Sequence, residues 1–371
     1  MENACSGATE RINAMPSHKL YYRIKKYIPR GTQLFLRRQL VRRQMRRYGN
    51  VWPIDEAAQT IPANWRVWPE GKKFALVLTH DVDTAKGAEN CIKLMMLELQ
   101  LGFRSSFNFV PERYAVPPEL RHELVANGFE VGLHGLNHDG KLYHSREIFK
   151  ARAQRINRYL EEWQAVGFRS PSMHHNLAWI HDLKIEYDAS TFDTDPFEPQ
   201  ADGVRTIFPF WIQNGSPAEG YVELPYTLPQ DFTLFVLMGR KNIDIWKKKL
   251  DWVVAKGGMV LLNVHPDYLN FGDKKCSQEE YPASYYRQFL EYVKERYDGE
   301  YWHVLPKELA KRFRPDFNEE FLNNLGTEVK DEVNYDRLPE SWIMRGDEDT
   351  KKIYHQAVSH FGELSRRESE L

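Results

Sequence analysis

The sequence predicts an α/β barrel in which parallel strands alternate with helices. From Phe74 onward, short apolar segments are each followed by a segment with helical spacing, as in "FALVLTH" and "GAENCIKLMMLELQLG". Strands that alternate with helices of about ten or more residues are typical of βα units and of a mostly parallel sheet. About six or seven such units between Phe74 and Phe313 favour a barrel over an open sheet.

The expected elements follow one another at regular intervals. The predicted strands are "FALVLTH" (74–80), "RSSFNFV" (104–110), "FEVGLHG" (129–135), "FRSPS" (168–172), "IEYDAST" (185–191), "MVLLNVHP" (259–266) and "YWHVLP" (301–306). The predicted helices are 87–102, 118–128, 145–167, 177–183, 243–258 and 282–297, and a closing helix follows the last strand.

Length and composition fit one large domain with extensions, or two domains. The chain has 371 residues, of which 42% are hydrophobic and 13% aromatic, so there is ample material for a core. Charged residues make up 28%, but the net charge is −1, so no nucleic-acid partner is expected. We expect a basic N-terminal extension and connector (1–73), a barrel (74–313) and an acidic C-terminal extension (314–371).

Cysteine usage and hydropathy predict a cytoplasmic protein. The three cysteines, Cys5, Cys91 and Cys276, are too far apart for a disulfide framework or a zinc-ribbon spacing. The N-terminal residues lack the apolar segment of a secretion signal, and no run approaches the ~18 apolar residues of a membrane span.

A basic segment precedes the barrel. Residues 19–47 contain eleven Lys or Arg and no Asp or Glu, and apolar residues such as Leu36 and Leu40 recur at roughly helical spacing. Such a helix can lie on an anionic membrane surface, which would place the protein at the inner face of the membrane. Alternatively, it packs on the barrel with its arginines in solvent, or the acidic tail after Asp316 neutralises it.

Metal-binding and acid-base side chains gather where the predicted strands end. Asp81 and Asp83 are two apart on a strand end, so both can face the barrel mouth. His134 and His138 are four apart, which on a helical turn places both imidazoles on one face. Two histidines and one carboxylate are a ligand set for a catalytic Zn²⁺ or a similar divalent ion, and the other aspartate can act as a base. Each pair alone is weak evidence, whereas the two together at different strand ends indicate a metal site.

Five motifs resemble those of the polysaccharide deacetylases, carbohydrate esterase family 4, also called the NodB-homology domain. They are "LTHDVD", "HGLNH", "FRSPS", "YDAS" and "LLNVHP", in this order, between Phe74 and Phe313. The resemblance implies a distorted (β/α)7 barrel and metal-dependent hydrolysis of N- or O-acetyl groups on sugars. It implies a zinc ion, with cobalt, nickel or manganese as alternatives.

The resemblance also assigns roles to individual residues. Asp81 resembles the catalytic base and Arg169 the arginine that holds it, while His265 resembles the general acid. The ligand set that the resemblance implies is Asp83, His134 and His138. The backbone N–H near Ser172 falls where the family has an oxyanion donor.

Three departures from the family pattern concern the substrate side. Val82 separates two aspartates that are commonly adjacent, and the third motif continues with Ser172-Met173 in place of a second proline and an aromatic residue. The fourth motif lacks a tryptophan, and we expect Asp188 to orient His265. Tyr226 and Tyr268 are expected at the barrel mouth, where they would stack on a sugar ring.

The sequence therefore predicts a hydrolase that removes an acetyl group from a sugar. A protein without a secretion signal would meet its substrate in the cytoplasm, which favours a soluble precursor or a lipid-linked intermediate of a surface polysaccharide. The alternatives are an amidohydrolase of the same fold that acts on a ureide or formamide, and an inactive carbohydrate-binding barrel.

Overall fold

The structure is a computed structural model that describes residues 29–315, apart from 63–64, 66 and 273–274. Residues 19–28 of the basic segment and the acidic tail lie outside the described residues. Within the described part of the chain, no helix is long and apolar enough to cross a bilayer.

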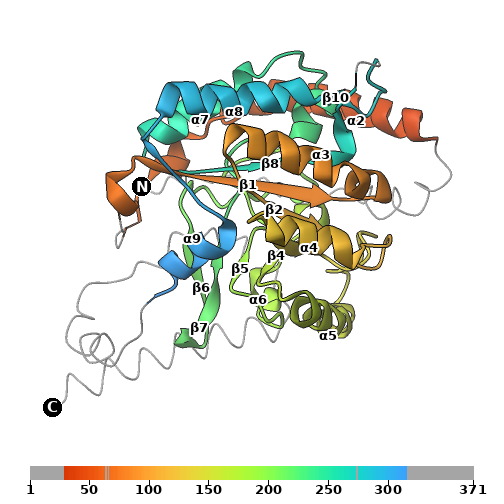
Figure 1. The fold of residues 1–371 in the computed structure, drawn as a ribbon, viewed down its shortest axis with the longest axis vertical. Coiled ribbons are helices and arrows are strands. Elements are labelled where there is room, and N and C mark those ends of the chain that lie inside the picture. Colours follow the sequence, from red (N-terminus) through yellow and green to blue (C-terminus); the bar gives the residue numbers. More distant parts are fainter. Residues whose placement is uncertain (1–28, 63–64, 66, 273–274, 316–371) are drawn as a thin grey trace, which may run out of the picture.

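A curled sheet of mostly parallel strands forms the centre of the molecule (Figure 1). Its strands are β1 (Phe74–Val82), β2 (Ser106–Phe109), β3 (Glu130–His134), β4 (Gly167–Arg169), β5 (Tyr187–Asp188), β6 (Phe210–Asn214), β7 (Ser216–Glu223), β8 (Met259–Asn263) and β11 (Tyr301–His303). Seven of them form one parallel run, in the order β8-β1-β2-β3-β4-β5-β7. β11 pairs with the start of β1, and β6 is antiparallel to β7.

The two ends of this run approach each other. Beyond β7, the backbone N–H groups of Thr227 and Leu228 donate to the carbonyl of Leu261 in β8 at 3.1 and 3.2 Å. The Thr227 hydroxyl accepts from the Leu261 N–H at 3.0 Å. The predicted α/β barrel of the distorted (β/α)7 kind is therefore confirmed, with a short side-chain-assisted junction in place of a full strand pair.

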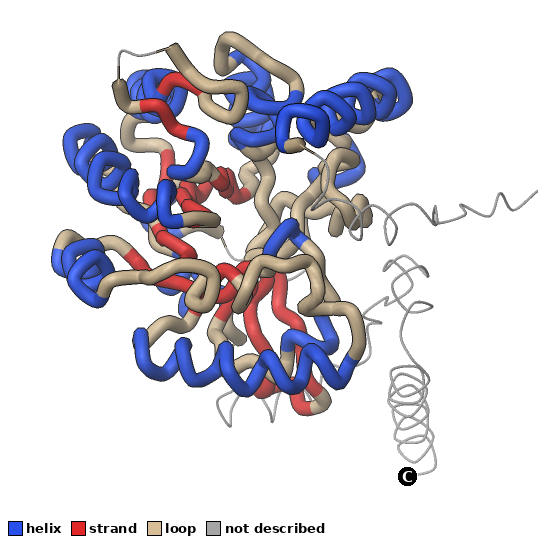
Figure 2. Tube along the Cα trace, turned by 90° about the vertical axis from the view of Figure 1, so that its right-hand side faces the viewer, coloured by secondary structure: helices blue, strands red, loops and turns tan. Residues whose placement is uncertain are grey.

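Helices surround the strands (Figure 2). They are α2 (Arg30–Tyr48), α3 (Ala85–Leu101), α4 (Pro118–Ala126), α5 (Arg146–Trp163), α6 (Leu177–Ile180), α7 (Asp244–Ala255), α8 (Ala283–Tyr297) and α9 (Pro306–Phe313). β9 (Leu269–Asn270) and β10 (Tyr281–Pro282) form a separate two-stranded ribbon.

The helices form where apolar residues repeat every three or four positions. In α5, Phe149, Ala153, Ile156 and Leu160 are buried, and the Ser145 hydroxyl caps the first turn by accepting from the Ile148 N–H. β1, by contrast, is buried along its whole length, because helices cover one face and the barrel interior covers the other. This burial places the polar residues at the end of β1 inside the barrel mouth.

A buried polar cluster fixes α3 against the barrel. The Glu98 carboxylate lies 2.8 Å from His80 Nε2 and accepts from the hydroxyls of Ser105 and Tyr286. His80 Nδ1 donates to the carbonyl of Val264 at 2.9 Å. Burial by itself would raise the pKa of Glu98, but His80 and the two hydroxyl donors lower it below its ordinary value. The cluster therefore holds an ionised carboxylate in the core.

Glu98→Gln should lower the free energy of unfolding by about 3–5 kcal/mol, because it removes one partner of a buried pair. Since the pKa of Glu98 is lowered in the folded state, its stabilisation is present above about pH 4.5 and is lost as the pH falls through the lowered pKa. Denaturant unfolding at several pH values measures both effects. Glu89→Gln, on the exposed side of α3, is the matched control and should change little. Equal effects of the two variants would contradict the structural role of Glu98.

Candidate active site

The carboxyl ends of β1, β3, β4 and β8 bring the predicted site residues together. Asp81 and Asp83 lie at the end of β1, His134 is the last residue of β3, Arg169 is the last residue of β4, and His265 follows β8. Because these strands belong to one continuous run of parallel strands, their ends open on the same side of the barrel.

Asp83, His134 and His138 form a group that can hold a metal ion. Their ligand atoms lie within 4.8 Å of one another. Asp83 Oδ1 is 3.1 Å from His138 Nε2 and 3.4 Å from His134 Nε2. Burial opposes the ionised form of Asp83, but His138 and His134, when both their ring nitrogens are protonated, hold its pKa well below the ordinary range.

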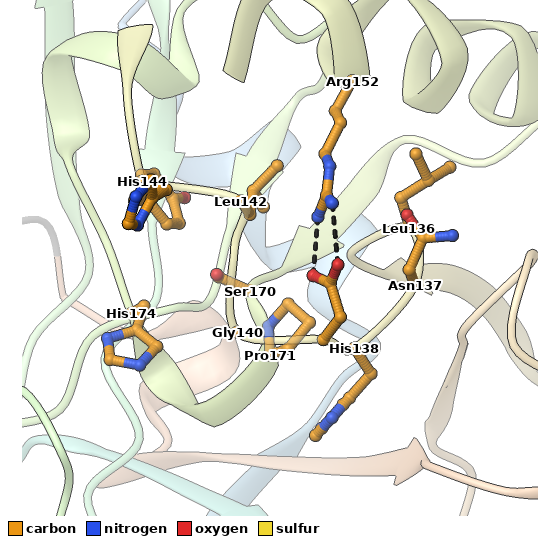
Figure 3. Close-up of a pocket in the computed structure, with 12 residues that line it drawn as sticks. Leu136, Asn137, His138, Gly140, Leu142, His144, Arg152, Ser170, Pro171 and His174 are labelled. Carbon is orange, nitrogen blue, oxygen red and sulfur yellow. Dashed lines mark hydrogen bonds and ion pairs between the residues drawn. The ribbon is translucent and has the colours of Figure 1, made fainter. Parts of the chain in front are cut away.

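The prediction that the two histidines lie on a helical turn is wrong. His134 ends a strand, and the chain then turns through left-handed backbone at Gly135 (φ 66°) and His138 (φ 52°). The turn brings the two imidazole rings to 5.2 Å between centroids. The pairing is thus achieved by a tight loop. The loop is fixed from outside by Asp139, whose carboxylate pairs with Arg152 at 2.7 and 2.8 Å (Figure 3).

Two observations show that the group fits a divalent cation. His134 Nδ1 lies 3.1 Å from the carbonyl of Arg169; a carbonyl only accepts, so Nδ1 carries the proton and the Nε2 lone pair points toward Asp83. Asp83 Oδ1 is buried, and within the described residues no hydrogen bond satisfies it. A buried carboxylate oxygen that faces two imidazole nitrogens is suited to a cation between them.

Asp81 is held as an anion next to this group. Its Oδ1 accepts from Arg169 at 3.2 Å and from Asn108 at 3.1 Å, and its Oδ2 accepts from Asn263 at 2.8 Å. Burial alone would raise its pKa, but Arg169, followed by His134, lowers it to about 2. Arg169 is itself fully buried and is fixed by Thr79 and by the carbonyl of Ala189. Asn108 and Asn263 were not predicted, although each lies on a strand that the sequence did predict.

His265 is oriented by Asp231, and the expectation that Asp188 does so is wrong. His265 Nδ1 lies 2.7 Å from Asp231 Oδ1, and its backbone N–H donates to Asp231 Oδ2 at 2.9 Å. Burial disfavours the imidazolium, but the charge of Asp231 outweighs it and raises the pKa of His265 to about 10. Asp188 accepts instead from Ser190, and burial raises its pKa. Asp231 begins the short helix η5 (Phe232–Leu237), in a segment that the sequence assigned to no strand or helix.

The three residues that were expected to contact the substrate differ in their burial and in their surroundings. The Tyr226 side chain is 1% exposed and its hydroxyl donates to Asp195, so the prediction that it stacks on a sugar at the mouth is wrong. Tyr268 is half-buried, and its ring lies 5.2 Å from that of His265. Ser172 lies in the turn after β4 with a left-handed φ of 57°.

A cavity of about 150 Å³ opens beside His138 (Figure 3). Ser170, Tyr143, His144 and His174 contribute to its lining. The cavity therefore lies next to the Asp83–His134–His138 group.

Comparisons with known proteins support the fold. No protein-family model matches the sequence, and no curated protein matches it. A putative polysaccharide deacetylase from Mycobacterium smegmatis has a similar structure, with 19% identity, a TM-score of 0.51, and coverage of 69% of this chain and 94% of its own.

Two further solved structures are similar to this chain. A probable polysaccharide deacetylase from Pseudomonas aeruginosa PAO1 is 15% identical with a TM-score of 0.51, and covers 67% of this chain and 94% of its own. The Puue allantoinase is 15% identical with a TM-score of 0.52, and the match covers 67% of this chain and 93% of the allantoinase chain.

Proposed function

We propose that this chain is a metal-dependent hydrolase of the deacetylase family that removes an N-acetyl or O-acetyl group from a sugar. Its fold, which is that of polysaccharide deacetylases and of an allantoinase, supports the proposal. The observation that carries the proposal is geometric: beside the metal-binding group, the Asp81 carboxylate accepts from Arg169 at 3.2 Å, and His265 Nδ1 lies 2.7 Å from Asp231 Oδ1. These contacts lower the pKa of Asp81 to about 2 and raise that of His265 to about 10. Two groups whose pKa values are driven apart are suited to act as base and acid in one reaction.

Asp83, His134 and His138 would hold the ion, with zinc first and cobalt, nickel or manganese as alternatives. When bound, such an ion supplies Lewis-acid polarisation of the acyl carbonyl and lowers the pKa of water. Asp81, held by Arg169 and two asparagines, accepts the proton of the attacking water at a carboxylate oxygen.

His265 completes the reaction from the other side of the scissile bond. Its Nδ1 faces Asp231, so Nε2 is the atom that donates a proton to the departing nitrogen. An amine is a poor leaving group without that proton. The backbone N–H near Ser172 is proposed as an oxyanion donor, and the half-buried ring of Tyr268 as a wall for the sugar.

The second candidate function is hydrolysis of a non-sugar amide such as a ureide or formamide. The structural likeness to an allantoinase favours it. The same acid, base and metal-binding group would serve both reactions, so the residues that contact the rest of the substrate distinguish them. An inactive barrel is disfavoured because each acid, base and ligand side chain is present and ordered around its partner.

The experiment that tests the function combines metal analysis with product release. Purified protein should contain about one divalent ion, and it should release acetate from at least one member of a panel of N- and O-acetylated sugars. His138→Ala should lose most of the metal and the activity while the fold remains, because its loop is not part of the core. His122→Ala, an exposed histidine on α4 that does not line the cavity, is the matched control and should retain both.

Release of product from allantoin or formamides alone would favour the second candidate. Full metal occupancy in His138→Ala would contradict the ligand assignment.

A further inference from the structure

The basic helix α2 is fixed to the barrel by one of its faces. Leu34 and Val41 are buried there, at 2% and 4% exposure. Arg38 points inward as well: its Nε donates to the carbonyl of Val236 at 3.0 Å and its guanidinium to that of Gln278 at 2.8 Å. Near the end of the helix, the Gln44 amide donates to the carbonyl of Pro196. α2 is therefore a rigid part of the domain surface, and its outward side is presented in one orientation.

The opposite side of α2 combines exposed apolar residues with arginines. Phe35, Leu36 and Leu40 are 58%, 49% and 54% exposed. We define the outer face of α2 as these three residues together with four exposed arginines, Arg42, Arg43, Arg46 and Arg47. At about 100° per residue, all seven lie within one half of the helix circumference. The helix sequence contains no Asp or Glu that could neutralise the arginines within the helix.

The flank of α2, next to the outer face, reaches toward the candidate active site. Arg37, on the flank of α2, lies over the ring of Phe232 in η5 at 5.0 Å. The Phe232 ring is 4.9 Å from that of Tyr268, which is 5.2 Å from that of His265. Figure 1 shows α2 at the end of the barrel toward which the β1 arrow points. A surface that binds the outer face therefore also lies beside the barrel mouth.

We propose that the outer face of α2 docks on an anionic phospholipid bilayer. Three large apolar side chains on one side of a helix can enter the interface between headgroups and acyl chains, and arginines beside them can contact lipid phosphates. Each arginine near an anionic surface should strengthen binding roughly fivefold, and this contribution weakens as salt rises. A second copy of the chain fits less well, because a two-fold contact would bring the arginines of both copies together. Nucleic acid would leave the apolar residues without a partner.

This docking reduces the range of substrate classes that fit the site. The inference rests on the proposed deacylation. The mouth at His265 would lie at the height of the lipid headgroups. The substrate class that fits is an acylated sugar joined to a membrane lipid, with the acyl group in the barrel and the lipid anchor left in the bilayer. Docking on a bilayer would not increase the rate at which a soluble sugar is hydrolysed.

The test is co-sedimentation of the full-length protein with phosphatidylcholine vesicles, with and without phosphatidylglycerol, at low and high salt. Wild-type protein should bind the anionic vesicles and dissociate as salt rises. Two variants test the face: Phe35→Ser/Leu40→Ser, and Arg42→Gln/Arg43→Gln/Arg46→Gln/Arg47→Gln. The arginine variant should bind at least about a hundredfold more weakly. A matched control removes four exposed charges on other helices, Lys150, Arg158, Lys311 and Arg312, each changed to Gln, and should bind like the wild type.

Several outcomes would overturn the proposal. The first is that the protein binds vesicles equally well with and without phosphatidylglycerol. The second is that both face variants bind anionic vesicles like the wild type. The third is that the protein forms a dimer without lipid and that the Phe35→Ser/Leu40→Ser variant is monomeric. Activity separates the docking from the function. Both face variants should hydrolyse a small soluble acetyl substrate at the wild-type rate and lose rate only on a vesicle-embedded glycolipid. Normal vesicle binding with no hydrolysis of any acetylated substrate would instead refute the deacylation and leave the docking intact.

Discussion

Asp81→Asn is expected to retain the divalent ion and to lose about 10²–10⁴-fold of the rate, the range for a positioned general base. The carboxylate is kept ionised by Arg169 and accepts from Asn108 and Asn263, so all of its partners favour the anion. An asparagine can keep the contact with Arg169 but cannot take a proton. The measurement is kcat on an N-acetylated substrate, together with metal content and thermal unfolding of the same sample.

Asp83→Asn is the matched comparison, because it makes the same chemical change two residues away. Asp83 faces both histidine Nε2 atoms and not the arginine, so this variant should lose affinity for the ion itself. Added metal should restore part of its activity, whereas it should not restore that of Asp81→Asn. The reverse pattern would mean that the roles of the two aspartates are exchanged.

Asp231→Asn is expected to slow amide hydrolysis by about 10²-fold or more, with a smaller effect on phenyl acetate. Asp231 is a positioning residue that acts through His265, whose pKa it raises to about 10. His265 must be protonated to donate to the leaving nitrogen, so the wild-type enzyme should keep this proton through neutral pH. Without the charge of Asp231 the pKa of His265 falls, and the alkaline loss of kcat/KM should move to lower pH. A phenolate leaves without protonation, so aryl esters should depend little on this pair.

Two further variants test the assignment. His265→Ala should show the same preference for aryl esters over amides, and a larger loss on amides. Tyr281→Phe removes a hydroxyl that donates to Asp231 at 3.0 Å but leaves the ion pair intact, so it should shift the pH profile little. Equal losses of Asp231→Asn on amides and aryl esters, with an unmoved pH profile, would show that Asp231 has only a structural role.

The sequence alone predicted the barrel and most of the side chains at its mouth. This was possible because both depend on local patterns. Alternation of apolar strands with helices implies parallel strands, and parallel neighbours end on one side of the barrel. Polar residues placed directly after apolar strands, such as Asp81, Asp83 and His134, must then lie near one another. Arg169 and His265 follow the same rule at the ends of β4 and β8.

The tertiary structure alone decided which partners those side chains have. Asp231 is 34 residues from His265 in the chain and begins a short helix with no strand-end signal, whereas Asp188 stood in a recognisable motif. Tyr226 lies in a loop that the sequence placed at the barrel mouth, but its side chain is buried in the structure. Phe35 and Leu40 face outward because the opposite side of α2 packs on the barrel. The physical reason is common to these cases. Periodicity and strand ends are properties of neighbouring residues, whereas ion-pair partners and the buried side of a helix depend on which distant segments pack together.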